Sequence, residues 1–233
     1  MGVIHVVRHG QAAFGTEHYD RLTEIGFTQA RLLGAYFARR NIRFDAVFTG
    51  TLRRQTETAQ GIFEGHSELG APPPQETFAG LDEYNPEAVM MAFTGNFPAP
   101  APAPAAARRD PVVVREHFRV LRDALLAWAE DRTQPEGMPA WQAFQEGAVA
   151  ALIEARRRFP DGNVLIVSSG GPIAAIVAGA LNAPAATAIE LNLRIRNSSL
   201  TEFASTPRRH HLVSFNGLPH LDTNSDPTLT TYA

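Results

Sequence analysis

The chain begins with a short apolar run whose ending constrains both the fold and the chemistry. Residues Val3–Val7 are β-branched apart from one histidine, which predicts a buried strand, and Arg8, His9 and Gly10 follow directly. In open α/β sheets the carboxyl ends of the strands form the edge where ligands bind. Histidine can be held neutral and nucleophilic near neutral pH, and arginine offers a planar fork of donors that fits a phosphate. The triplet therefore predicts an anion site with a nucleophile at the edge of a sheet.

The alternation of strand and helix patterns sets the fold class. A helix pattern over 23–37, a strand pattern over 45–48 and a helix pattern over 52–63 follow the opening strand. The second half predicts helices over 114–128 and 141–159, a strand over 164–167, an alanine-rich helix from about 172, and strands over 200–203 and 212–215. This order predicts an α/β fold: a single domain over 1–233 with a mostly parallel central sheet and helices on both faces.

Two stretches have less regular patterns. Residues 77–81 predict a short strand or a segment at the rim of the sheet. The alternating Pro-Ala tract at about 97–107 favours extended conformation. We expect this tract to form a surface excursion, because it does not separate two halves that could each fold alone.

Composition excludes several classes of function. The formal net charge is −3, so the chain lacks the basic surplus of proteins that bind nucleic acid or anionic membranes. The absence of cysteine excludes disulfides and thiolate metal sites. No apolar run is long enough to span a membrane, and the first residues lack the pattern of a signal peptide. We therefore expect a cytoplasmic protein with no nucleic-acid or membrane partner.

A second strand end resembles the first. The apolar strand that ends at Val167 runs into Ser168-Ser169-Gly170-Gly171, and in a parallel sheet this turn would face the same edge as His9. A helix that starts there would point free N–H groups at the edge and favour an anion. Arg53 and Arg54 add cations on the first helical turn after the second strand, where the helix dipole disfavours them. Because an anionic ligand would offset that cost, we expect one arginine to point into the site and the other to solvent.

These motifs resemble those of the histidine phosphatase superfamily, which has the phosphoglycerate mutase-like fold. The resemblance covers residues 3 to about 180, and the motifs keep the order of the family. They are Arg8-His9-Gly10, Leu22-Thr23-Glu24-x-Gly26-x-x-Gln29-Ala30, Leu52-x-Arg54-x-x-x-Thr58-Ala59, Leu81-Asp82-Glu83 and Val167-Ser168-Ser169-Gly170-Gly171. The chain is identified on these motifs as a member of the superfamily.

The resemblance also implies a role for each site residue. The implied catalytic residues are His9 and Glu83, and the implied phosphate-binding residues are Arg8, Gln11, Arg54, Ser169 and Gly170. For Gln11, contact with the substrate and capping of its own loop are equally favoured. We expect the arginines to lower the pKa of His9 and partial burial to raise the pKa of Glu83. Because the arginines supply the positive charge, no metal and no cofactor are expected.

One position departs from the pattern of the superfamily. The last motif usually carries a second histidine where this chain has Ser169. A serine hydroxyl donates one neutral hydrogen bond, whereas the charge-assisted bond of an imidazolium is roughly twice as strong. Losing a preorganised donor typically lowers the rate by about 10²–10³.

The implied function is a metal-independent phosphatase that hydrolyses a small phosphomonoester through a phosphohistidine on His9. Two alternatives stay open. A phosphoglycerate mutase-type enzyme would return the phosphoryl group to its product, and a catalytically impaired phosphate-binding or regulatory domain would result if Ser169 does not replace the missing histidine. The sequence leaves the identity of the substrate and the oligomeric state open.

Overall fold

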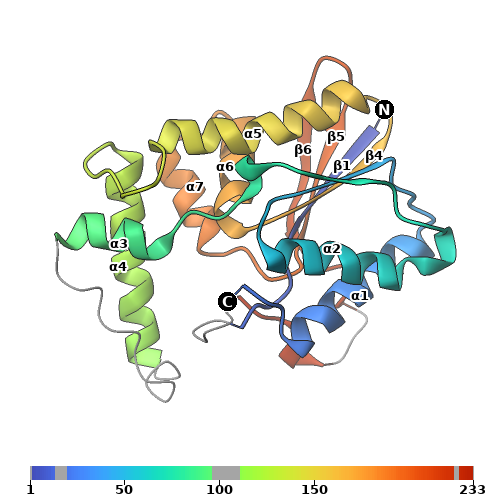
Figure 1. Ribbon diagram of the computed structural model, residues 1–233, viewed down its shortest axis with the longest axis horizontal. Helices are drawn as coiled ribbons and strands as arrows, with labels where there is room; N and C mark the ends of the chain where they lie inside the picture. Colours follow the sequence, from blue (N-terminus) through green and yellow to red (C-terminus); the bar gives the residue numbers. More distant parts are fainter. Residues whose placement is uncertain (1, 14–19, 96–110, 223–225, 233) are drawn as a thin grey trace.

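Four parallel strands form one side of a six-stranded sheet. The computed structural model describes residues 2–13, 20–95, 111–222 and 226–232, whose elements are arranged as in Figure 1. The strands are β1 (Gly2–Arg8), β2 (Ala46–Thr49), β3 (Gln75–Thr77), β4 (Asn163–Ser168), β5 (Leu200–Ser205) and β6 (His210–Gly217). Their order is β3-β2-β4-β1-β5-β6, in which the first four run parallel to one another, β5 is antiparallel to β1, and β6 is antiparallel to β5. The prediction of a mostly parallel sheet is confirmed.

Helices cover both faces of this sheet (Figure 1). They are α1 (Glu24–Arg39), α2 (Arg53–Gly65), α3 (Pro86–Thr94), α4 (Pro111–Ala129), α5 (Trp141–Arg158), α6 (Gly170–Ala180) and α7 (Ala185–Asn192), with short 3-10 turns at Ser67–Leu69, Ala79–Leu81 and Pro227–Leu229. Alternate residues of β4 enter different cores, because side chains alternate across a strand. Val164 and Ile166 pack with α4, α5 and α6, and Leu165 and Val167 pack with α1 and α2. The prediction of helices on both faces is confirmed.

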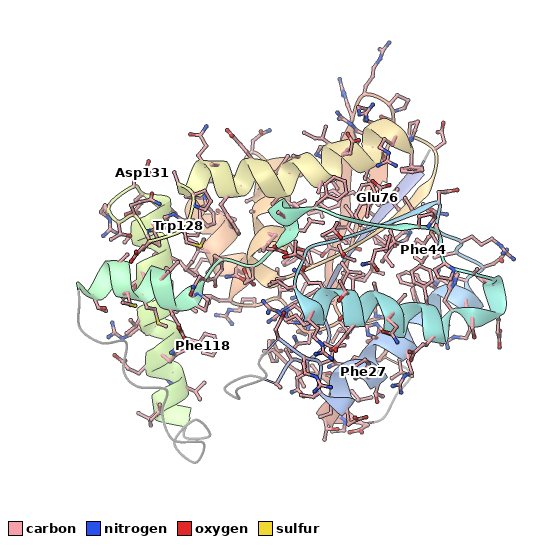
Figure 2. All side chains as sticks on the ribbon, viewed as in Figure 1. Phe27, Phe44, Glu76, Phe118, Trp128 and Asp131 are labelled. Atoms are coloured by element: carbon pink, nitrogen blue, oxygen red, sulfur yellow. The ribbon has the colours of Figure 1, made fainter. Side chains whose placement is uncertain are left out.

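Each of these two cores contains a cluster of aromatic rings (Figure 2). Trp128 of α4 is fully buried, with its ring centroid 5.1 Å from that of Trp141 and 5.3 Å from that of Phe144. In the other core, Phe44 meets Phe37 edge-on at 5.0 Å. The clusters therefore join helices to each other and to the sheet, and their rings are core side chains.

Close packing of α1 against α2 fixes where α2 begins relative to β1. A Cβ atom at Gly34 of α1 would lie 1.9 Å from the carbonyl oxygen of Ile62, so this contact requires glycine. α1 itself begins at Thr23, whose hydroxyl accepts a hydrogen bond from the Gly26 N–H at 3.1 Å. The first turn of α2 is thereby held beside the carboxyl end of β1.

The structure adds two helices to the sequence-based expectations and shifts the start of a third. α3 and α7 lie where the pattern predicts no helix. Residues 77–81 hold the end of β3 and then a 3-10 turn, and α6 begins at Gly170, which puts Pro172 in the first turn, where its missing N–H costs no hydrogen bond. The predicted excursion at 97–107 lies outside the described residues. Among the helices that are described, none is long and apolar enough to cross a membrane.

Candidate active site

The two glycine turns meet at the carboxyl edge of the sheet. β1 and β4 are adjacent and parallel, with Arg8 opposite Ser168, and the His9 N–H donates to the Ser168 carbonyl oxygen at 2.9 Å. β2 lies on the other side of β4, so the first turn of α2 starts at the same edge. The structure therefore brings together the segments that carry His9, Arg54 and Ser169.

His9 is held in one tautomer. Its side chain is buried, its Nδ1 lies 2.7 Å from the Gly10 carbonyl oxygen, and the Arg54 Nε–H donates to its Nε2 at 3.2 Å. Because a guanidinium only donates, Nε2 must carry a lone pair, and the ring proton sits on Nδ1, where it binds Gly10. Burial, Arg8 and then Arg54 hold the pKa of His9 well below its usual value. The site therefore contains a neutral imidazole with its lone pair facing a cation.

Arg54 is the buried member of the arginine pair. Besides His9 it contacts Asp20, whose Oδ1 lies 2.7 Å from Nη1. The residue that precedes α2 gives no side-chain cap, and Asp20 Oδ2 instead accepts from the Arg53 N–H at 2.8 Å. The carboxylate thus offsets both the guanidinium and the positive end of the helix dipole. Arg53 is exposed and pairs with Glu57 at 2.6 Å.

Arg8 is the second arginine near His9. It is partly buried, and its Nη1 donates to the carbonyl oxygens of Ile195 and of Tyr232, the latter at 2.7 Å. Arg8 and Arg54 both act on the pKa of His9 and on that of Glu83. Two cations therefore lie close to the proposed nucleophile and to the proposed acid.

Glu83 sits at the N-terminus of α6. The Gly171 N–H lies 3.1 and 3.2 Å from its two carboxylate oxygens, and a Cβ at Gly171 would come within 2.2 Å of Oε1. Burial raises the pKa of Glu83 against the opposing effects of Arg54, the Gly171 hydrogen bond and Arg8. The neighbouring Asp82 is engaged elsewhere, since it accepts from the N–H and hydroxyl of Thr51 at 2.6 Å each. A carboxyl group that stays protonated at higher pH than usual suits a general acid.

Ser169 and Gly170 open α6 within this cluster. Ser169 is fully buried, and its Oγ accepts from the Gln55 Nε2 at 2.9 Å. Its neighbour Ser168 donates from Oγ to the Leu81 carbonyl oxygen at 2.7 Å. A Cβ at Gly170 would lie 2.5 Å from the Asn192 Oδ1, so a side chain at the start of α6 would displace the amide of Asn192.

Gln11 holds its own loop. Its backbone N–H donates to the Gln29 Oε1 at 2.8 Å, and its side-chain Oε1 accepts from the Thr23 hydroxyl at 2.9 Å. The Thr23 N–H also donates to the Gln11 carbonyl oxygen at 2.9 Å. These contacts favour the loop-capping role over contact with a substrate.

Three residues outside the predicted site hold the backbone of His9 in place. The His9 carbonyl oxygen accepts from the Ser198 N–H at 3.1 Å and from the Asn197 Nδ2 at 3.3 Å. The Ser198 Oγ lies 2.9 Å from the His220 Nε2, and burial lowers the pKa of His220 to about 3, so this histidine is neutral. They lie outside the motifs named in the sequence analysis, and only the folded chain brings them beside His9.

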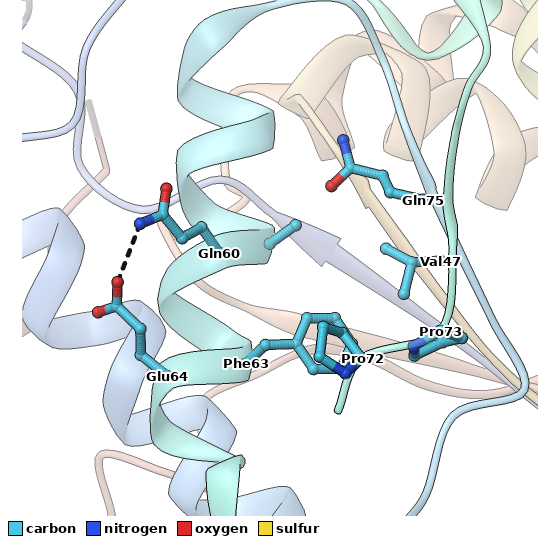
Figure 3. A pocket seen from close by; sticks show the side chains of 8 residues that line it. Val47, Gln60, Phe63, Glu64, Pro72, Pro73 and Gln75 are labelled. Atoms are coloured by element: carbon cyan, nitrogen blue, oxygen red, sulfur yellow. Dashed lines mark hydrogen bonds between the residues drawn. The ribbon is translucent and has the colours of Figure 1, made fainter. Parts of the chain in front are cut away.

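One groove in the structure lies apart from these residues. It has a volume of about 420 Å³ and lies between α2 and the segment that leads into β3 (Figure 3). It is lined by Val47, Ala59, Gln60, Phe63, Glu64, Pro72, Pro73 and Gln75. Within the described part of the chain, no group of three or more histidine and acidic side chains could hold a metal ion.

Known proteins share this fold. No curated protein matches the chain in sequence. Three solved structures illustrate the similarity. A phosphoserine phosphatase from Entamoeba histolytica in complex with 3-phosphoglyceric acid is 18% identical, with a TM-score of 0.63, covering 95% of this chain and 100% of that one. A phosphoglycerate mutase from Bacillus anthracis is 19% identical, with a TM-score of 0.62 and 94% of both chains covered. A mycobacterial glucosyl-3-phosphoglycerate phosphatase is 23% identical, with a TM-score of 0.58, covering 92% of this chain and 98% of that one.

The family assignment rests on a match to a family model over most of the sequence. The model of the histidine phosphatase superfamily (branch 1) matches residues 4–93 and 108–217, which include every predicted site residue. The sheet order and the meeting of β1, β4 and α2 agree with the fold that the resemblance implies. The chain belongs to the histidine phosphatase superfamily.

Proposed function

We propose that the protein is a metal-independent phosphatase that hydrolyses a small phosphomonoester through a phosphohistidine on His9, and that it acts in the cytoplasm. The observation that carries the proposal is the state of His9: a buried, neutral imidazole whose Nε2 lone pair faces Arg54. Membership of the superfamily and the fold shared with two phosphatases support it.

In the first step the Nε2 of His9 attacks phosphorus and the bond to the ester oxygen breaks. The leaving alkoxide takes the proton of Glu83, which its raised pKa keeps available. Arg54 turns its N–H groups from Nε2 to the phosphoryl oxygens, and Arg8 and Arg54 neutralise their charge. The step ends with phosphohistidine, a free alcohol and the Glu83 carboxylate.

In the second step a water molecule attacks the same phosphorus from the side the alcohol has left. The Glu83 carboxylate takes one proton of this water, its oxygen bonds to phosphorus, and the bond between phosphorus and Nε2 breaks. Inorganic phosphate leaves, and His9 is again neutral with its proton on Nδ1. Glu83 is protonated for the next cycle.

A panel of phosphomonoesters, assayed with and without a chelator, tests this function. We expect release of inorganic phosphate that the chelator does not reduce, and a loss of at least about 10⁴ in kcat for the folded His9→Ala variant. Conversion of a substrate to a phosphorylated isomer without release of phosphate would instead show a mutase. Turnover that persists in His9→Ala, or no turnover of any ester, would overturn the proposal.

A further inference from the structure

The hydroxyl of Ser169 has a specific partner. Ser169 precedes α6 in the N-cap position, where a serine usually accepts a hydrogen bond from the helix, but here it makes no side-chain cap bond. Its Oγ is completely buried and accepts from the Gln55 Nε2 at 2.9 Å. The orientation of the Ser169 hydroxyl is therefore fixed by a residue of α2, not by α6, the helix that Ser169 precedes.

The amide of Gln55 can take only one orientation. Its Nε2 also donates to the Leu81 carbonyl oxygen at 2.8 Å, and reversing the amide would set two oxygens against each other. Its Oε1 is buried without a partner among the described residues, and it lies where a Cβ of Gly50 would be, 2.1 Å away. The absence of a side chain at Gly50 thus leaves room for the amide, whose NH₂ group is fixed against Ser169.

This orientation determines what Ser169 can offer to a ligand. Since its Oγ accepts from Gln55, its own O–H is available as a donor, and no acceptor within the described structure takes that proton. Ser169 lies between Ser168, whose carbonyl oxygen binds His9, and Gly171, whose N–H binds Glu83. A phosphoryl group that passes between His9 and Glu83 would come beside this hydroxyl.

Resting on the function proposed above, we propose that Gln55 is a positioning residue that turns Ser169 into a hydrogen-bond donor for the transferring phosphoryl group. Position 169 is the one at which the last motif of the superfamily usually carries its second histidine. An imidazole that extended from position 169 toward Gln55 would overlap the amide, which is only 2.9 Å from the serine oxygen. The pocket is therefore built around serine, and histidine would fit only after Gln55 is made smaller.

A double-mutant cycle tests the link between the two residues. Gln55→Leu keeps the bulk and removes both donors, and the Leu81 carbonyl oxygen keeps its bond from Ser168, so the fold should survive. We expect Gln55→Leu and Ser169→Ala each to lower kcat/KM by about 10- to 100-fold, and the double variant to fall no further. Additive losses, or a Gln55→Leu variant with normal kcat/KM and a lower Tm, would show a merely structural role and overturn the proposal.

Binding of inorganic phosphate to the same four proteins separates this proposal from the phosphatase function. Calorimetry should show equal weakening in the two single variants and no further weakening in the double variant, whether or not the wild type turns over an ester. If the wild type binds phosphate with this pattern but hydrolyses nothing, the phosphatase function fails and the role of Gln55 stands. Additive weakening, with turnover intact in the wild type, overturns only the role of Gln55.

Introducing a histidine at position 169, with and without a smaller residue at position 55, gives a second test. Ser169→His alone should lower kcat, because the imidazole meets the amide of Gln55. The double change Gln55→Ala with Ser169→His should recover at least part of that loss. An increase in kcat with Ser169→His alone would contradict a pocket built around serine.

Discussion

The carboxyl ends of β1 and β4 lie side by side, and they contribute different chemistry to one site. The end of β1 carries a guanidinium and an imidazole, whereas the end of β4 carries two neutral hydroxyls and the N-terminus of α6. α2 contacts both ends: Arg54 donates to His9, Thr58 accepts from the Gly10 N–H, and Gln55 donates to Ser169. One helix therefore fixes the charged end of β1 and the neutral end of β4 in position relative to each other.

The same cations act differently on the two titrating groups at this edge. At His9, burial and the arginines both lower the pKa, so they act together to keep the imidazole neutral. At Glu83, burial raises the pKa while Arg54 and Arg8 lower it, and burial prevails. A neutral nucleophile and a protonated acid can therefore coexist beside two guanidinium groups, as the first step of the proposed reaction requires.

Removing Arg54, the cation of α2 that contacts the end of β1, should cause a large loss of activity. We expect Arg54→Ala to lower kcat/KM by about 10³, because a buried guanidinium facing the reacting group is lost. Arg53→Ala, one residue away on the exposed side, should stay within about threefold of the wild type. Steady-state kinetics on both variants measures this, and similar losses in the two would contradict the assignment of Arg54 to the site.

Glu83, which binds the N-terminus of α6, should control the pH dependence of both steps of the reaction. Phosphorylation of His9 needs protonated Glu83, so its rate should fall as pH rises through the raised pKa of Glu83. Hydrolysis of the phosphohistidine needs the carboxylate, so its rate should rise over the same range. His9 stays neutral throughout because its pKa is lowered. The phosphorylated fraction should therefore increase as pH falls.

Rapid-quench kinetics from about pH 4.5 to pH 8 would measure both steps. Glu83→Gln should lower kcat by roughly 10²–10⁴ and remove the opposite pH dependences. Asp82→Asn is the matched control, since Asp82 binds Thr51, and it should keep the profile of the wild type. An unchanged profile in Glu83→Gln would mean that another group is the acid.

The smallest effect should come from breaking the hydrogen bond between α2 and the turn that follows β1. It should appear in the free energy of unfolding. Thr58 is buried and accepts from the Gly10 N–H at 3.0 Å, so Thr58→Val would leave that N–H unpaired. We expect a loss of about 1–3 kcal/mol in the free energy of unfolding. The hydroxyl of Thr56 donates, among the described residues, to the Arg53 carbonyl oxygen on the same helix, so Thr56→Val should cost less. Denaturant unfolding compares them, and equal losses would show that the Gly10 contact adds nothing.

The sequence predicts the parts of this arrangement that depend on strand ends. Because β1 and β4 run parallel, their carboxyl ends bring Arg8 and Ser168 to the same edge of the sheet. Burial at that edge shifts the pKa values of His9 and Glu83 in the predicted directions. The motifs also align Arg54 with the site, and the structure places it against His9.

The partners of these residues could not be read from the chain. Asp20 reaches Arg54 across a loop, Gln55 reaches Ser169 from another helix, and His220 reaches Ser198 from beyond β6. Each pairing depends on packing between elements far apart in sequence, and none has a local pattern. The helices α3 and α7 were missed for a related reason, because they are short and carry weak apolar periodicity.

Direct trapping of the phosphorylated enzyme tests the central claim, that His9 is the nucleophile of the charged strand end. The protein would be mixed with a phosphomonoester from the panel near the acid end of its pH range, quenched in alkali, and digested for mass spectrometry. We expect a phosphate on His9 that is stable in alkali, labile in acid and absent from His9→Ala. Turnover without any such label, or a label on another residue, would contradict it.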